Sequence, residues 1–192
     1  SLIAGVALIE AVRNVSAEDE VVEHWADRDL RLKWPNDLIC DGAKLGGVLI
    51  ETTALAADDT ERAVVIGFGL NLAIAPEVPD RPTTSLNALL GRSVAPVDML
   101  RHLDVALLSA LCDWDCGAGF NVIRKRWLAH SGPEGEKLKV NLGAEKHISG
   151  RSVGLDPSGA LLLRDDFGTL HTITFGDVEF GSTTAQTSGD QT

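Results

Sequence analysis

Residues 33–51 have the sequence KWPNDLICDGAKLGGVLIE, and this stretch decides how the middle of the chain folds. Apolar and basic side chains alternate from Leu30 to Trp34, a segment that overlaps the start of this stretch. Such alternation is typical of a strand with one buried face. A proline turn follows. Leu38 to Cys40 and Leu45 to Glu51 then flank the dipeptide Asp41-Gly42, which suits the positive φ angles of a tight hairpin turn. The stretch therefore predicts a strand, a turn and a β-hairpin.

The segments on either side of this stretch predict helices and one further strand. Leu2 to Arg13 is apolar at almost every position, so we expect a helix buried on most sides. Ala63 to Phe68 is rich in β-branched residues and is predicted as a central strand. Residues 98–114 repeat large apolar side chains at helical spacing, and a second helix is expected around Phe120 to Leu128. Together these segments predict an α+β fold with a mixed sheet flanked by helices.

The C-terminal part of the chain has a different pattern. From Ser131 onward, short apolar segments are separated by turns such as Asp156-Pro157-Ser158-Gly159. Leu138, Val140 and Leu142 alternate with polar residues, so we expect a small SH3-like β-barrel here. The last residues are Ser, Thr, Gly and Gln without an apolar anchor. The predicted domains are residues 1–134, residues 135–180 and a disordered tail over residues 181–192.

The composition excludes several classes of protein. The 192 residues carry 28 acidic and 17 basic side chains, a net charge of −11, which opposes non-specific binding to nucleic acid or to an anionic membrane surface. The apolar run Leu2 to Ile9 is much shorter than the ~20 residues that cross a bilayer. Cys40, Cys112 and Cys116 are an odd, sparse set without paired zinc-type spacing, which is typical of a reducing compartment. We therefore expect a cytoplasmic protein that does not bind membranes or nucleic acid through this segment.

Residues that can carry chemistry gather around the hairpin. Lys33, Asn36 and Asp37 surround a rigid proline turn at a strand end, Lys44 follows the tight turn, and Gly46-Gly47 lets a ligand lie against the backbone. An ammonium group in a partly dehydrated pocket stabilises charge on a transferring phosphate, and a carboxylate can hold magnesium. The pattern predicts a nucleotide site. The alternative is that the asparagine and aspartate only form a turn and that the second lysine is solvated.

Three segments resemble, in their order, the signature motifs of biotin protein ligases: Lys33–Asp37 (KWPND), Lys44–Glu51 (KLGGVLIE) and Gly67–Asn71 (GFGLN). In weaker form the similarity extends over most of residues 1–180. It implies a catalytic domain of the class II synthetase type followed by an SH3-like module. It also implies a reaction in which biotin and ATP form biotinyl-5′-AMP and pyrophosphate. A lysine of a biotin carboxyl carrier domain, as in acetyl-CoA carboxylase, then accepts the biotin.

The resemblance assigns roles to single residues. Lys44 corresponds to a lysine that contacts the carboxylate region of biotin and the α-phosphate, and Asp37 corresponds to an aspartate implicated in catalysis. Taken alone, the pattern Gly67-x-Gly69-x-Asn71 is weak support, because a buried strand that ends in a glycine turn has the same pattern. The implied sites are biotin binding by Lys44, Gly46, Gly47 and Val48, ATP binding by Lys33, Asn36 and Asn71, and Mg²⁺ binding by Asp37 and Asn71.

The chain departs from the family pattern at one point. Biotin protein ligases have an arginine- and glycine-rich loop upstream of the first helix that closes over biotin and the adenylate, and no such segment occurs in these residues. The chain also begins with Ser1 in a helical pattern. We therefore expect a carboxy-terminal part of a longer protein with an incomplete biotin site, and a preceding DNA-binding domain stays an open question.

Other interpretations remain open from the sequence. A lipoate ligase or octanoyltransferase shares the catalytic fold and a pocket lysine, although the KWPND turn and the terminal module favour biotin. A non-catalytic fragment that binds a nucleotide or a partner is a second alternative. An exposed sheet edge can pair with another copy and form a homodimer. Cys112 and Cys116 lack further ligands for a metal, so we expect them to be buried small side chains.

Overall fold

The computed structural model describes residues 1–17, 25, 27–55, 62–143 and 146–181. These residues form two compact units, which we describe separately. The first comprises Ser1–Gly132 and the turn Pro157–Gly159, and the second comprises Pro133–Asp156 and the chain from Ala160 onward. The domain boundaries predicted from the sequence stay predictions, and residues 182–192 of the predicted tail lie outside the described residues.

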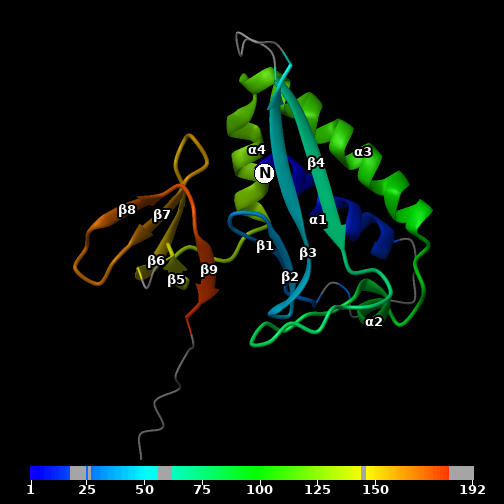
Figure 1. Cartoon of the computed structure of the whole chain (residues 1–192), viewed down its shortest axis with the longest axis horizontal. Coiled ribbons are helices and arrows are strands. Elements are labelled where there is room, and N and C mark those ends of the chain that lie inside the picture. Colours follow the sequence, from blue (N-terminus) through cyan, green and yellow to red (C-terminus); the bar gives the residue numbers. More distant parts are fainter. Residues whose placement is uncertain (18–24, 26, 56–61, 144–145, 182–192) are drawn as a thin grey trace, which may run out of the picture. The chain divides into compact units, whose positions relative to one another are not determined.

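A four-stranded sheet forms the centre of the first unit (Figure 1). Its strands β1 (Leu30–Lys33), β2 (Asp37–Cys40), β3 (Ala43–Ala54) and β4 (Arg62–Leu70) follow one another in the order β1-β2-β3-β4, and each neighbouring pair is antiparallel. Isolated parallel bridges join Leu32 to Ser131 and Lys44 to Thr83, so the sheet has parallel as well as antiparallel pairing. The predicted hairpin is confirmed, because Asp41 (φ 50°) and Gly42 (φ 79°) form the turn between β2 and β3.

Helices cover one face of this sheet. α1 (Leu2–Ala17) is buried along most of its length and packs against α3 (Pro96–Trp114), α4 (Phe120–Ala129) and strands of the sheet. A short α2 (Leu86–Leu90) begins at Ser85, and a single 3₁₀ turn, Asp115–Gly117, joins α3 to α4. In Figure 1, α1 passes behind the strands and α3 runs beside β4. The α+β prediction is therefore confirmed.

Two predictions about burial in the first unit are wrong. β4 is not a central strand, because it ends the sheet formed by the described residues, and Val64 and Val65 are 57% and 56% exposed. A β-branched composition favours a strand without specifying how many neighbours the strand has. Cys112 and Cys116 are both exposed, and only Cys40 is a buried cysteine.

The second unit is an open sheet, not the predicted closed barrel. Its strands β5 (Lys137–Asn141), β6 (His147–Leu155), β7 (Leu161–Arg164), β8 (Leu170–Ile173) and β9 (Asp177–Phe180) have the order β8-β7-β6-β5-β9. Closure requires hydrogen bonding between the two end strands, and among the described residues β8 and β9 do not pair. The side chains of Leu138 and Val140 are both buried, so these two residues point inward as predicted. Within the described part of the chain, no helix is long and apolar enough to cross a membrane.

Candidate active site

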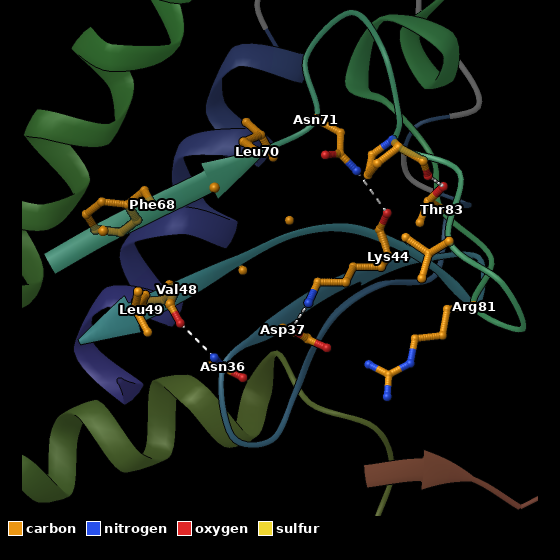
Figure 2. Close-up of a pocket in the computed structure, with 16 residues that line it drawn as sticks. Asn36, Asp37, Lys44, Val48, Leu49, Phe68, Leu70, Asn71, Arg81 and Thr83 are labelled. Carbon is orange, nitrogen blue, oxygen red and sulfur yellow. Dashed lines mark hydrogen bonds and ion pairs between the residues drawn. The ribbon is translucent and has the colours of Figure 1, made fainter. Parts of the chain in front are cut away.

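A pocket of about 750 Å³ lies on the face of the first unit's sheet where β2, β3 and β4 approach the loop after β4 (Figure 2). It brings together most of the residues that the sequence selected, together with several that it did not. The described residues in its wall are Asn36, Asp37, Lys44, Gly46, Gly47, Val48, Leu49, Gly67, Phe68, Gly69, Leu70, Asn71, Pro76, Val78, Arg81 and Thr83.

The floor of the pocket is backbone. Gly47 lies opposite Gly69, and Leu49 lies opposite Gly67, on neighbouring antiparallel strands. A Cβ atom built on Gly67 or Gly69 meets its nearest neighbours at 3.5 and 3.8 Å, which is ordinary contact, so the space above these glycines is open. At Gly46, on the other face, a Cβ meets the Gly69 carbonyl oxygen at 2.5 Å. A flat ligand therefore has room over residues 67 and 69. A Cβ atom on Gly47 would instead meet the Asn36 carbonyl oxygen and Asp37 Oδ1 at 3.2 Å, and Gly46 is required for strand packing.

Charge at the pocket is concentrated in one cluster. Lys44 Nζ lies 2.5 Å from Asp37 Oδ1, and Lys33 Nζ lies 3.2 Å from Asp37 Oδ2. The side chains of Lys33 and Asp37 are 13% and 9% exposed, while that of Lys44 is 41% exposed. Lys44 extends along the pocket wall with Asp37 behind it (Figure 2). The cluster contains two ammonium groups that contact opposite oxygens of one carboxylate.

The two asparagines that the sequence assigned to nucleotide binding hold the backbone of the site. Asn36 Nδ2 donates to the Val48 carbonyl oxygen at 2.7 Å, and Val48 N donates back to the Asn36 carbonyl oxygen at 2.9 Å. Asn71 Nδ2 donates to the carbonyl oxygens of Lys44 at 3.3 Å and Thr84 at 3.0 Å. These bonds fix the strand ends around Lys44. A carboxamide oxygen remains on each side chain as an acceptor for a ligand.

The loop after β4 is attached to the lysine by main-chain bonds. Lys44 N donates to the Pro82 carbonyl oxygen at 2.8 Å, and Thr84 N donates to the Lys44 carbonyl oxygen at 3.0 Å. Thr83 Oγ1 donates to the Pro76 carbonyl oxygen at 2.6 Å and closes the loop on itself. This arrangement places Arg81 at the rim of the pocket (Figure 2). This loop was not predicted to line the site, because an irregular proline-containing segment has no periodicity to indicate where it folds.

The far end of the hairpin is anchored by a separate ion pair. Arg28 Nη1 donates to Asp41 Oδ2 at 2.6 Å, and this hydrogen bond holds the pKa of Asp41 below its ordinary value. Burial raises the pKa of the Cys40 thiol to about 11, so that thiol stays protonated at neutral pH. Neither group lines the pocket, and both stabilise the turn that leads to Lys44.

Magnesium has few protein ligands among the described residues of the pocket. Asp37 is the only carboxylate in the wall listed above, and each of its oxygens already faces an ammonium group. Within the described part of the chain, no group of three His, Cys, Asp or Glu side chains is placed to hold a metal ion. A magnesium ion can also arrive with the phosphates of a nucleotide, which supply most of its ligands. The predicted magnesium roles of Asp37 and Asn71 stay predictions, and no step below depends on them.

Comparison with known proteins identifies the family. A family model described as Biotin/lipoate A/B protein ligase family matches residues 3–71, which include β1 to β4 and the core of the pocket. A second one, described as Biotin protein ligase C terminal domain, matches residues 135–181. The chain belongs to the biotin protein ligase family. Both matched segments lie within regions that the sequence resemblance already covered.

Individual biotin protein ligases show the same relationship. A biotin–[acetyl-CoA-carboxylase] ligase of Paracoccus denitrificans is 36% identical over 158 residues, which cover 79% of this chain and 63% of the relative. A protein of the same name from Mycobacterium tuberculosis is 30% identical over 185 residues, which cover 93% of this chain and 60% of the relative. The chain thus spans less than two thirds of either relative. The apo structure of biotin protein ligase from Aquifex aeolicus has the same fold, with a TM-score of 0.73 at 23% identity, covering 94% of this chain and 74% of that structure.

Proposed function

We propose that this chain is part of an ATP-dependent biotin protein ligase and supplies the Lys44 side of its active site. In the first step it joins biotin and ATP into biotinyl-5′-AMP, and in the second it transfers biotin to a lysine of a biotin carboxyl carrier domain. The observation that carries the proposal is the Lys44–Asp37 pair beside a glycine floor, in a pocket whose strands lie within the family match. The names of the relatives support the same reaction.

The first step brings two anions together. A biotin carboxylate oxygen attacks the α-phosphorus of ATP, a new P–O bond forms, and the bond between the α-phosphorus and the bridging oxygen breaks so that pyrophosphate leaves. Catalysis of such a step consists mainly of positioning and charge neutralisation. The half-exposed ammonium of Lys44 is placed to neutralise charge on the α-phosphate, while Asp37 holds that ammonium in place.

The pocket offers separate surfaces for the two substrates. Gly46, Gly47 and Val48 supply the backbone-lined side that we assign to biotin, and the floor extends over Gly67 and Gly69. Asn36 and Asn71 supply acceptors on the side that we assign to ATP. Asp37 and Asn71 are the residues that would hold magnesium, which would lower the charge of the ATP phosphates. This division follows the open floor on one side and the polar side chains on the other.

In the second step, the amine of the acceptor lysine attacks the acyl carbon of biotinyl-5′-AMP. An amide bond forms, the acyl–oxygen bond to the phosphate breaks, and AMP leaves while the amine loses a proton. The acceptor that we propose is the carrier domain of acetyl-CoA carboxylase or a related carboxylase. The free thiols of the exposed cysteines suit a reducing compartment, so we infer a cytoplasmic location. The outer edge of β4, next to Val64 and Val65, is a candidate surface for pairing with a second copy.

Biotin-dependent exchange of labelled pyrophosphate into ATP tests the proposed function. We expect exchange with biotin and at least tenfold less with lipoate or octanoate at equal concentration. Faster exchange with lipoate would replace the proposal with a lipoate ligase, an alternative that the match to the biotin-type C-terminal domain disfavours. No exchange with any of the three acids, from a chain that stays folded by circular dichroism, would instead indicate a non-catalytic binding domain.

A further inference from the structure

Lys33 lies behind the carboxylate of the charged cluster and not in the wall of the pocket. It is the last residue of β1 and lies directly opposite Asp37, the first residue of β2, in the antiparallel pair. Its Nζ contacts Asp37 Oδ2 at 3.2 Å, while the other oxygen, Oδ1, accepts from Lys44 Nζ at 2.5 Å. Asp37 thus joins a shielded ammonium to one that faces the ligand.

We propose that Lys33 is a positioning residue that acts through Asp37 on Lys44, and that it does not contact the nucleotide. Its effect on catalysis rests on the proposed function, whereas its effect on the geometry of Lys44 does not. This role differs from the nucleotide contact that the sequence resemblance implies for Lys33.

The first reason is geometric. The terminal torsion of an aspartate is broad, and a lysine side chain has several rotatable bonds, so a single ion pair fixes neither group well. Two ammonium groups on opposite oxygens define the plane of the Asp37 carboxylate. Because the Lys33 side chain is only 13% exposed, solvent competes weakly for its half of this arrangement. Lys44, which is 41% exposed, depends on the oriented carboxylate for its position.

The second reason is electrostatic. Asp37 alone would cancel the charge of Lys44, and an incoming phosphate would then meet a neutral pair. Lys33 contacts the second oxygen of the carboxylate, so Asp37 cancels less of the charge of Lys44. In a partly dehydrated site this difference acts strongly on developing negative charge. Lys33 therefore lets Asp37 hold Lys44 without removing its attraction for the phosphate.

The same strand supplies a matched control. Arg31 is two residues before Lys33 and so projects from the same face of β1. It is 14% exposed and forms an ion pair with Asp29, with Nε at 3.2 Å from Oδ2. Lys33→Met and Arg31→Met thus remove a cation of similar burial from one strand, and the 3.2 Å contact between Lys33 and Asp37 is lost in the first variant.

The direct test is the ¹H–¹⁵N signal of the Lys44 ammonium group in the 192-residue chain, assigned by its loss in Lys44→Met. We expect a signal protected from water exchange in the parent and in Arg31→Met. In Lys33→Met it should broaden or shift, and Lys33→Arg should restore it because a charged partner of Asp37 is present again. An identical Lys44 signal in the parent and in Lys33→Met, with both folded, would overturn the proposal.

A kinetic cycle tests the consequence for catalysis. In biotin-dependent pyrophosphate exchange, Lys33→Met should lower kcat by about tenfold and change the KM for ATP by less than about threefold, because no nucleotide contact is lost. In an Asp37→Asn background the same substitution should cost less than about twofold, because the residue through which Lys33 acts is already changed. A full tenfold loss in that background, or a loss confined to KM, would contradict the positioning role. Absence of exchange in the parent would refute the proposed function alone, and the ammonium signal would still decide the position of Lys44.

Discussion

Lys44→Met should remove most of the adenylate-forming activity and leave the fold intact. The ion pair of Lys44 with Asp37 is part-exposed, so its loss should cost less than about 1 kcal/mol of unfolding free energy. Asp37 is not left as an unpaired buried charge, because Lys33 still contacts its second oxygen at 3.2 Å. One preorganised donor at a reacting phosphoryl group is worth about 3 kcal/mol, which corresponds to about a 10²-fold loss of kcat.

Two measurements on the same samples separate these effects. Urea unfolding gives the free energy of unfolding, and biotin-dependent pyrophosphate exchange gives the rate. Lys125→Met, at an exposed position of α4 outside the pocket, is the control for loss of a lysine and should leave both quantities unchanged. The reasoning is refuted if Lys44→Met unfolds like the parent and exchanges pyrophosphate at the parental rate.

Three further predictions concern the glycines of the pocket floor, the hydrogen bonds of Asn71 and the β2–β3 hairpin. Gly69→Ala should leave the free energy of unfolding nearly unchanged and weaken biotin binding about tenfold by calorimetry. Gly46→Ala should instead lower the free energy of unfolding by about 1–3 kcal/mol in urea, because its Cβ meets a backbone oxygen at 2.5 Å. Equal stabilities of the two variants would contradict this. Asn71→Ala should lower the free energy of unfolding by about 1–2 kcal/mol, since it removes the donor to two carbonyl oxygens. An unfolding midpoint equal to that of the parent would contradict this role of Asn71. Because Arg28 lowers the pKa of folded Asp41, the stabilisation is complete above the unfolded value of about 3.9 and is lost as the pH falls through the folded value. Melting curves of the parent and Asp41→Asn should therefore converge on acidification from pH 5, and a constant difference would exclude this linkage.

Local features of the fold were predictable because a few neighbouring residues determine them. The β2–β3 hairpin follows from Asp41-Gly42, which adopts the two positive φ angles that the turn requires. The buried helix at the start of the chain was predicted only to Arg13 and continues to Ala17. Ser16 explains the difference, because its hydroxyl donates to the Val12 carbonyl oxygen at 2.6 Å and allows a polar residue to be buried.

Features that depend on distant partners were not predictable from the sequence. The number of neighbours of β4 and the closure of the C-terminal sheet depend on which strands pair, and side-chain alternation does not encode this. The residues of the site divide in the same way into those set by local sequence and those set by distant partners. Asp37 and Lys44 were selected from the turn and the hairpin, whereas Arg81 reaches the rim through bonds between Lys44 and the loop near Pro82, almost forty residues later.

A crystal structure of the chain with a non-hydrolysable sulfamoyl analogue of biotinyl-5′-AMP tests the central claim most directly. The account predicts that the acyl-sulfamate group lies within hydrogen-bond distance of Lys44 Nζ, with the biotin rings over the backbone of Gly67 and Gly69. It also predicts that Asp37 keeps both of its lysine contacts. An analogue bound away from this pocket, or bound in it with Lys44 turned away from the acyl-sulfamate, would contradict the account.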